Sequence, residues 1–224
     1  MNTKINRTCT MLVVSVVCTA LIILPAYTAE FNVKDHLSKI TTKTENTGTE
    51  YWALLFAVGV YRNHSNQNRP SMLEAVDDLY DVLVDSPEWQ PDHIHVIKGS
   101  QATGLRLIHE LLWLIQNEGR NDMSLVYITT HGSPLKHPVT KEPIDLPPKD
   151  EADGADEILV MYDGFETSYS FIWDDLLNFF LSMLQSKGVC LIVDSCFSGG
   201  FDDSPFRGMT QNYSAKSFNN GLAN

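Results

Sequence analysis

Continuous apolar runs dominate the hydrophobic pattern of this chain and predict buried strands. Three of them are residues 51–60, 124–130 and 189–194, which are rich in β-branched, aromatic and leucine side chains. Runs of this kind are typical of parallel strands that are covered on both faces. Two other stretches, residues 93–97 and 156–163, predict further strands.

Apolar residues at helical spacing fill the intervals between these runs. They predict helices over residues 72–83, with a start at Pro70 and Ser71, over residues 105–116 and over residues 172–184. The stretch 132–153 carries five prolines and is expected to be irregular. The resulting order of strands and helices indicates an α/β fold, a three-layer α/β/α sandwich with a mostly parallel sheet.

A targeting segment precedes the predicted domain. Lys4 and Arg7 form a short basic region, and residues 11–24 form an apolar run that is short for a membrane span. Small residues at 25–29 offer a cleavage site, although Tyr27 is bulky. We therefore expect residues 1–29 to be a signal peptide, which makes the protein secreted or exported, or else an uncleaved membrane anchor. Residues 30–50 are interpreted as a linker, 51–204 as the domain and 205–224 as a flexible tail.

The net charge limits the classes of partner, and the cysteine positions argue against disulfides. The 224 residues carry a formal net charge of −12, which argues against binding to nucleic acid and against adhesion to an anionic membrane surface. Of the four cysteines, Cys9 and Cys18 fall in the leader. The other two, Cys190 and Cys196, lie on one predicted strand and its exit, so no disulfide framework is expected.

Cys196 occupies a position where open α/β sheets place their chemistry, just past the end of a buried strand. Cys190 lies inside that strand and is expected to be a small buried side chain. A nucleophilic thiol needs a base, and His131 directly follows the strand 124–130. If the two strands are parallel neighbours, His131 and Cys196 emerge at the same sheet edge. We therefore expect them to form a catalytic dyad.

The residues around these two positions match a known pattern. A strand followed by His131-Gly132, and a second strand followed by Asp194-Ser195-Cys196-Phe197-Ser198-Gly199-Gly200, resemble the caspase-like cysteine peptidases, in particular the metacaspases. The resemblance covers roughly residues 51–203. It implies a caspase-like sheet, protein or peptide substrates, and an oxyanion that the backbone N–H groups of Gly132 and Cys196 stabilise. No third residue that orients His131 can be chosen from the sequence.

Acidic residues carry the specificity that the resemblance implies. Metacaspases prefer a basic residue before the scissile bond, and their motif places one aspartate two residues before the cysteine, which is Asp194 here. A second aspartate belongs to the first helix, where Asp78 matches best and Asp77 is the rival. A carboxylate pair facing an arginine or lysine side chain is physically sensible. Asp77 and Asp78 fit a solvated helix face equally well.

Calcium is the one cofactor that the resemblance suggests, and the peptidase chemistry itself requires none. Some metacaspases resemble this chain in an acidic set that comprises Asp156, Asp174, Asp175 and Asp203 here. Hard oxygen ligands from several loops suit calcium. Scattered aspartates are also common surface charges, and carboxylates in a first helical turn favour the helix dipole.

The end of the chain departs from the resemblance. A caspase-like domain has two more strands and at least one helix after the catalytic loop, and the 28 residues after Cys196 do not resemble them. We therefore expect a domain truncated at its C-terminus, in which the Cys196 strand forms, or lies next to, an open sheet edge. A second chain or a missing C-terminal segment would complete such a fold.

Three other interpretations stay open. The first is a catalytically weak or inactive caspase-like domain that serves as an interaction module, against which the intact His131 and Cys196 count. The second is a legumain-like peptidase, which shares the strand-His-Gly and strand-Cys arrangement but usually lacks Asp-Ser before the cysteine. The third is a hydrolase that uses Ser195 or Ser198, although neither serine lies in a Gly-x-Ser-x-Gly elbow.

Overall fold

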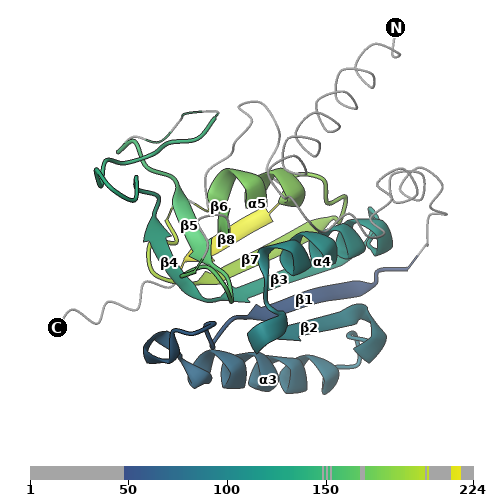
Figure 1. Ribbon diagram of the computed structural model, residues 1–224. Helices are drawn as coiled ribbons and strands as arrows, with labels where there is room; N and C mark the ends of the chain where they lie inside the picture. Colours follow the sequence, from purple (N-terminus) through teal and green to yellow (C-terminus); the bar gives the residue numbers. More distant parts are fainter. Residues whose placement is uncertain are drawn as a thin grey trace, which may run out of the picture. The chain divides into compact units, whose positions relative to one another are not determined.

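The computed structural model describes residues 48–147, 149, 151, 153–166, 170–199 and 201, together with the backbone of 213–217 (Figure 1). These residues belong to one compact unit of the chain, Thr42–Asn224. The predicted leader, most of the predicted linker and Asp203 lie outside the described residues. Among the helices of the described part, none is long and apolar enough to cross a membrane.

A five-stranded parallel sheet forms the centre of the fold (Figure 1). Each neighbouring pair is parallel, and the order is β2 (Ile94–Lys98), β1 (Tyr51–Ala57), β3 (Met123–Thr129), β7 (Gly188–Asp194) and β8 (Tyr213–Ser217). The order reverses between β1 and β3, because β2 lies on one side of β1 and the later strands lie on the other. Open α/β sheets bind ligands at the carboxyl ends of strands next to such a reversal.

Helices cover both faces of this sheet, so the predicted three-layer α/β/α arrangement is confirmed (Figure 1). α3 (Pro70–Val84) connects β1 to β2, and α4 (Gly104–Asn117) connects β2 to β3. Proline in the first turn starts α3, and Thr103 caps α4 by accepting a hydrogen bond from the Arg106 N–H at 3.3 Å. Short 3-10 helices lie in the connections: η1 (Ser65–Gln67), η2 (Pro91–His93) and η3 (Gly99–Gln101).

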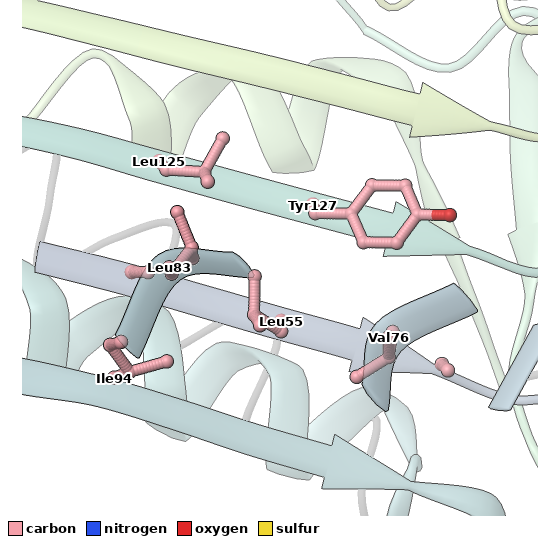
Figure 2. Close-up of a cluster of buried hydrophobic side chains, with 8 residues drawn as sticks. Leu55, Val76, Leu83, Ile94, Leu125 and Tyr127 are labelled. Carbon is pink, nitrogen blue, oxygen red and sulfur yellow. The ribbon is translucent and has the colours of Figure 1, made fainter. Parts of the chain in front are cut away.

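A packed apolar cluster fills the layer between the sheet and α3. Figure 2 shows Leu55, Leu125 and Tyr127 on the strands together with Val76 and Leu83 of α3. The alternate residues of β1 and β3 are fully buried on the opposite face, which α4 covers: Leu54, Phe56, Val126 and Ile128. Burial on both faces explains why these strands are continuous apolar runs in the sequence.

A small antiparallel sheet begins two residues after β3. It consists of β4 (His131–Pro134), β5 (Glu157–Val160) and β6 (Phe171–Trp173), and α5 (Asp174–Leu181) follows β6 at once. Two predictions are wrong here. The stretch 132–153 is not irregular throughout, because its first residues pair with β5. The predicted helix over 172–184 starts later, because Phe171–Trp173 pairs with β5 as a strand before the helix begins.

The segment after β7 contains a strand that the hydrophobic pattern misses. The pattern predicts a flexible tail over residues 205–224, yet residues 213–217 form β8 and pair with residues 189–193 of β7. Main-chain hydrogen bonds to the outer edge of β7 do not require apolar residues at regular spacing, so this strand has no strong signal in the sequence. In the described sheet, β8 is therefore the edge strand, and β7 is one strand further in.

Candidate active site

The register of β3 and β7 brings the two candidate catalytic residues to one place. The strands are parallel neighbours, and their last residues, Thr129 and Asp194, lie opposite each other. His131 and Cys196 each follow two residues beyond that pair. The backbones stay joined at this point, since the N–H of Thr130 donates to the carbonyl oxygen of Asp194 at 3.3 Å. The prediction that both residues leave the sheet at the same edge is confirmed.

Gly132 lies directly against the backbone of Cys196. A Cβ atom added to Gly132 would come 1.9 Å from the carbonyl oxygen of Cys196 and 3.0 Å from Ser195 Oγ. The first distance excludes any side chain at position 132 while the loop keeps this path. The contact explains the glycine after His131, and it places the two residues expected to supply oxyanion donors, Gly132 and Cys196, next to each other.

A main-chain carbonyl orients the side chain of His131. Its Nε2 lies 2.8 Å from the carbonyl oxygen of Gln67, in η1 after β1. A carbonyl oxygen can only accept, so Nε2 carries the proton, and in the neutral ring Nδ1 is the nitrogen left for proton exchange. Sequence reasoning missed this partner because a backbone oxygen is supplied by any residue type at position 67.

Tyr61 fixes the main chain of His131. The N–H of His131 donates to the Tyr61 hydroxyl at 2.9 Å. Thr130 Oγ1 donates to the carbonyl oxygen of Val160 at 2.5 Å, so at the 3.0 Å contact between the two hydroxyls Tyr61 is the donor and Thr130 the acceptor. Tyr61 is 4% exposed, and burial is the main cause that raises its pKa. This buried network ties His131 to the loop after β1 and to the end of β5.

Cys196 lies on a strained turn after β7. Its side chain is exposed, whereas Ser198 and Phe201 are 2% and 1% exposed and anchor the turn. Phe197 has a φ of +56°, a left-handed conformation that costs on the order of 1–3 kcal/mol in a residue other than glycine. Strain of this kind persists where the surroundings enforce it, and it clusters at functional sites. Cys190, inside β7, is half-buried, and neither thiol forms a disulfide.

Hydroxyl donors from β3 hold the carboxylate of Asp194. Its Oδ2 accepts from Thr129 Oγ1 at 3.2 Å and from the Tyr127 hydroxyl at 3.4 Å. Burial, followed by the nearby charge of Asp194, raises the pKa of Tyr127 to about 12, so the tyrosine keeps its proton throughout the physiological range. Asp194 therefore presents a fixed carboxylate two residues before the thiol.

The aspartates of α3 lie on the exposed side of that helix. Asp77 forms an ion pair with Lys98 at the end of β2, three strands away from β7 in the sheet. Asp78 is exposed and, at about 100° per residue, lies about 200° around the helix from the buried Val76. The solvated-face interpretation fits both exposed residues, and the substrate-binding role of Asp78 stays a prediction. Asp194 is the predicted specificity residue that lies at the end of the strand leading to the thiol.

Three of the four candidate calcium ligands lie together. Asp156 immediately precedes β5, and Asp174 and Asp175 open α5 directly after β6. Because β5 pairs with β6, oxygens of these three carboxylates lie within 4.8 Å of one another. Glu151 and Glu157 form a similar group with Asp174, and the sequence signal for them is the density of acidic residues before β5. Asp203, the fourth candidate, lies outside the described residues.

Burial makes Asp174 hard to ionise. Burial is the largest cause that raises its pKa, to about 7, and the charges of Asp156 and Asp175 raise it further. The N–H of Asp175, which donates to Asp174 Oδ1 at 2.9 Å, opposes this shift. Near neutral pH the group of carboxylates therefore either keeps a proton or is stabilised by a bound cation. Carboxylate oxygens from two elements are the donor set that calcium prefers.

Comparisons with known proteins give likenesses among solved structures and none among family models or curated proteins. No family model matches the chain, and no curated protein matches it. Among solved structures, the chain is similar to protein GSU0716 from Geobacter sulfurreducens, with 18% sequence identity and a TM-score of 0.48. The match covers 66% of this chain and 50% of that one, so the chain spans about half the length of that protein. At this level of similarity the comparison assigns neither a family nor an activity.

Proposed function

We propose that the chain is a cysteine endopeptidase of the caspase-like, metacaspase type, with Cys196 as the nucleophile and His131 as the acid and base. The observation that carries the proposal is the alignment of the ends of β3 and β7, which places both residues at one edge with Gly132 against the Cys196 backbone. An exposed thiol, an oriented imidazole and a closely approaching glycine backbone are the parts that acyl transfer needs.

The proposed reaction proceeds through a thioester. Cys196 Sγ attacks the carbonyl carbon of the scissile bond, and its proton passes to Nδ1 of His131. The carbonyl oxygen gains negative charge, which the N–H groups of Gly132 and Cys196 stabilise. The C–N bond then breaks, and His131 protonates the departing amine. Water, deprotonated by the same imidazole, hydrolyses the thioester, releases the acid product and restores the thiol.

The proposed substrates are proteins or peptides with arginine or lysine before the scissile bond. Asp194 supports this preference, because its carboxylate is fixed by two hydroxyl donors and lies on the strand that delivers the thiol. The residue before the scissile bond stays attached to Cys196 as the thioester, so its side chain is the part of the substrate that can reach Asp194. A carboxylate with a charged guanidinium or ammonium partner forms one of the stronger hydrogen bonds in proteins.

Asp194→Asn should lower kcat/KM for cleavage after arginine or lysine by about 10²-fold, because a neutral amide no longer compensates the substrate cation. Thr129 and Tyr127 can still donate to the amide oxygen, so the strand end is expected to keep its geometry. Steady-state kinetics on matched fluorogenic peptides measures the effect. Alkylation of Cys196 by iodoacetamide is the control and should keep its rate. An equal loss of kcat/KM on peptides with an uncharged residue at this position would show that Asp194 does not determine specificity.

We extend the proposal to a calcium site formed by Asp156, Asp174 and Asp175, which Asp203 completes by resemblance. Asp156 and Asp174 are buried and Asp175 is half-buried, and a bound divalent cation would supply the positive charge that lets Asp174 ionise. The ligands join the start of β5 to the start of α5. Since β5 pairs with β4, which begins at His131, the site would brace the sheet that carries the catalytic histidine.

Calcium at a hundredfold excess over its Kd is expected to raise Tm at pH 7.5 by about 5–10 °C, which corresponds to about 2.7 kcal/mol. Without calcium, stability should fall as pH rises from about 4 to about 7. The folded-state pKa of Asp174, about 7, lies above its ordinary value of 3.8, so the unfolded chain loses this proton first. At pH 5 protons compete with the ion, and the calcium shift should shrink.

Thermal scans with and without calcium at the two pH values test this site. Asp174→Asn should remove both the calcium shift and the loss of stability on raising the pH. Asp78→Asn, which changes an exposed aspartate on α3, is the matched control and should keep both. A calcium shift that survives in Asp174→Asn would show that the ion binds elsewhere.

We also propose that this peptidase acts outside the cytoplasm, either exported or anchored to a membrane. The support is the basic and apolar leader over residues 1–29. The net charge of −12 supports a partner other than nucleic acid.

A library of internally quenched peptides tests the proposed function. Cleavage after arginine and lysine is the expected profile. A preference for asparagine would favour the legumain-like alternative, and a preference for aspartate would favour a caspase. A folded, monodisperse protein that cleaves no member of the library and forms no adduct with a peptidyl electrophile would favour the interaction module and contradict the proposal.

A further inference from the structure

Two loops that are distant in the sequence place aromatic rings beside His131. Phe165, in the turn after β5, makes edge-on contacts with Tyr61 and His131, with ring centroids 5.1 Å and 6.2 Å apart. His64, in the loop after β1, contacts Phe165 at a centroid distance of 5.3 Å. Phe165 and His64 are called the aromatic wall below.

Hydrogen bonds lock the two loops together. The N–H of Arg62 donates to the carbonyl oxygen of Tyr162 at 2.8 Å, and Asn63 Nδ2 donates to Glu166 Oε1 at 2.6 Å. Gly164 is closely enclosed, since a Cβ atom there would come 2.7 Å from the carbonyl oxygen of Ser170. The turn that carries Phe165 is therefore anchored on both sides of the ring.

Phe165 nevertheless stays 39% exposed. Part of an apolar surface therefore faces solvent next to the catalytic histidine. Apolar groups with a few polar neighbours are the usual lining of substrate sites. A substrate side chain that covers the exposed part of the ring gains the free energy of removing apolar surface from water.

The proposed chemistry decides which part of the substrate meets this wall. His131 protonates the leaving amine, so the residue that follows the scissile bond must pass beside His131. The residue before the bond remains on Cys196, on the side of Asp194. We infer that the aromatic wall of Phe165 and His64 binds the side chain that follows the scissile bond and selects an apolar or aromatic residue there. This inference rests on the peptidase function proposed above.

The test compares peptides that differ only in the residue after the scissile bond. The parent enzyme should cleave Lys-Phe and Lys-Leu peptides with a kcat/KM about tenfold higher than Lys-Gly and Lys-Asp peptides, which is the range for one apolar side chain in a pocket. Phe165→Ala should erase this preference, whereas Phe165→Leu should keep it for the leucine peptide. Val82→Ala trims a side chain that is 66% exposed on α3 and should keep the parent profile.

A lysine-terminated peptide aldehyde separates this inference from the proposal on which it rests. The aldehyde ends at the reacting carbon and occupies nothing beyond the scissile bond, so its inhibition constant should be the same for the parent and for Phe165→Ala. If the aldehyde inhibits the parent but the parent cleaves all the peptides with the same kcat/KM, the inference is overturned and the peptidase proposal stands. If Phe165→Ala loses aldehyde affinity and kcat/KM for every peptide to the same extent, Phe165 only positions His131. That result also overturns the inference. No binding of the aldehyde to the parent would contradict the peptidase proposal itself.

Discussion

Cys196→Ala is expected to lower peptidase activity by at least about 10⁴-fold, because alanine cannot form the covalent intermediate. The protein should still fold. The Cys196 side chain is exposed, and substitutions of exposed residues usually change stability by no more than about 0.5 kcal/mol. Hydrolysis of a lysine peptide and a thermal scan, measured on the same preparation, report the two effects.

Cys190→Ala provides the matched control for this prediction. Cys190 lies inside β7 opposite Leu125 and is half-buried, so its loss should cost about 1 kcal/mol of stability and leave activity near the parent value. If Cys196→Ala were as active as the parent, Cys196 could not be the nucleophile, and Ser195 and Ser198 would become the candidates.

Gly132→Ala is expected to lower kcat/KM by about 10²-fold or more without changing any catalytic side chain. The new Cβ atom would come 1.9 Å from the carbonyl oxygen of Cys196, so the loop that carries the thiol has to move. Displacement of reacting groups by about 1 Å commonly costs about 10²-fold in rate. Alkylation by a small reagent should continue, because the thiol stays exposed.

Gly199→Ala is the control for Gly132→Ala, because an added Cβ atom at Gly199 meets nothing within 4 Å. It lies three residues after Cys196 on the same loop and should keep both activity and stability close to those of the parent. If Gly132→Ala kept full activity, the close contact of Gly132 with the Cys196 backbone would have no catalytic meaning.

The sheet and the position of the dyad could be predicted because they depend on long, local patterns. Continuous apolar runs identify strands that are buried on both faces, and residues directly after such strands must lie at the carboxyl edge. His131 and Cys196 follow from that argument once β3 and β7 are neighbours, and the structure places them so. Helix α3 was predictable for the same reason, from its apolar spacing and from Pro70 at its start.

The features that the sequence did not reveal depend on contacts between distant segments. The Gln67 carbonyl has no side-chain signature, and Tyr61 is defined as a partner of His131 only by the folded loop after β1. β4 and β6 are short strands that exist because β5 lies between them. Asp78 matches the metacaspase motif by position, yet its place opposite Val76 on α3 leaves it exposed.

The central claim is that Cys196 and His131 react as a pair. The most direct measurement is the second-order rate at which a lysine peptidyl acyloxymethyl ketone labels the parent and His131→Ala, with the modified residue mapped by mass spectrometry. The account predicts one adduct, on Cys196, with Cys190 unmodified, and a rate about 10²-fold lower in His131→Ala. Labelling of Cys190 instead, or a rate that is the same with and without His131, would contradict it.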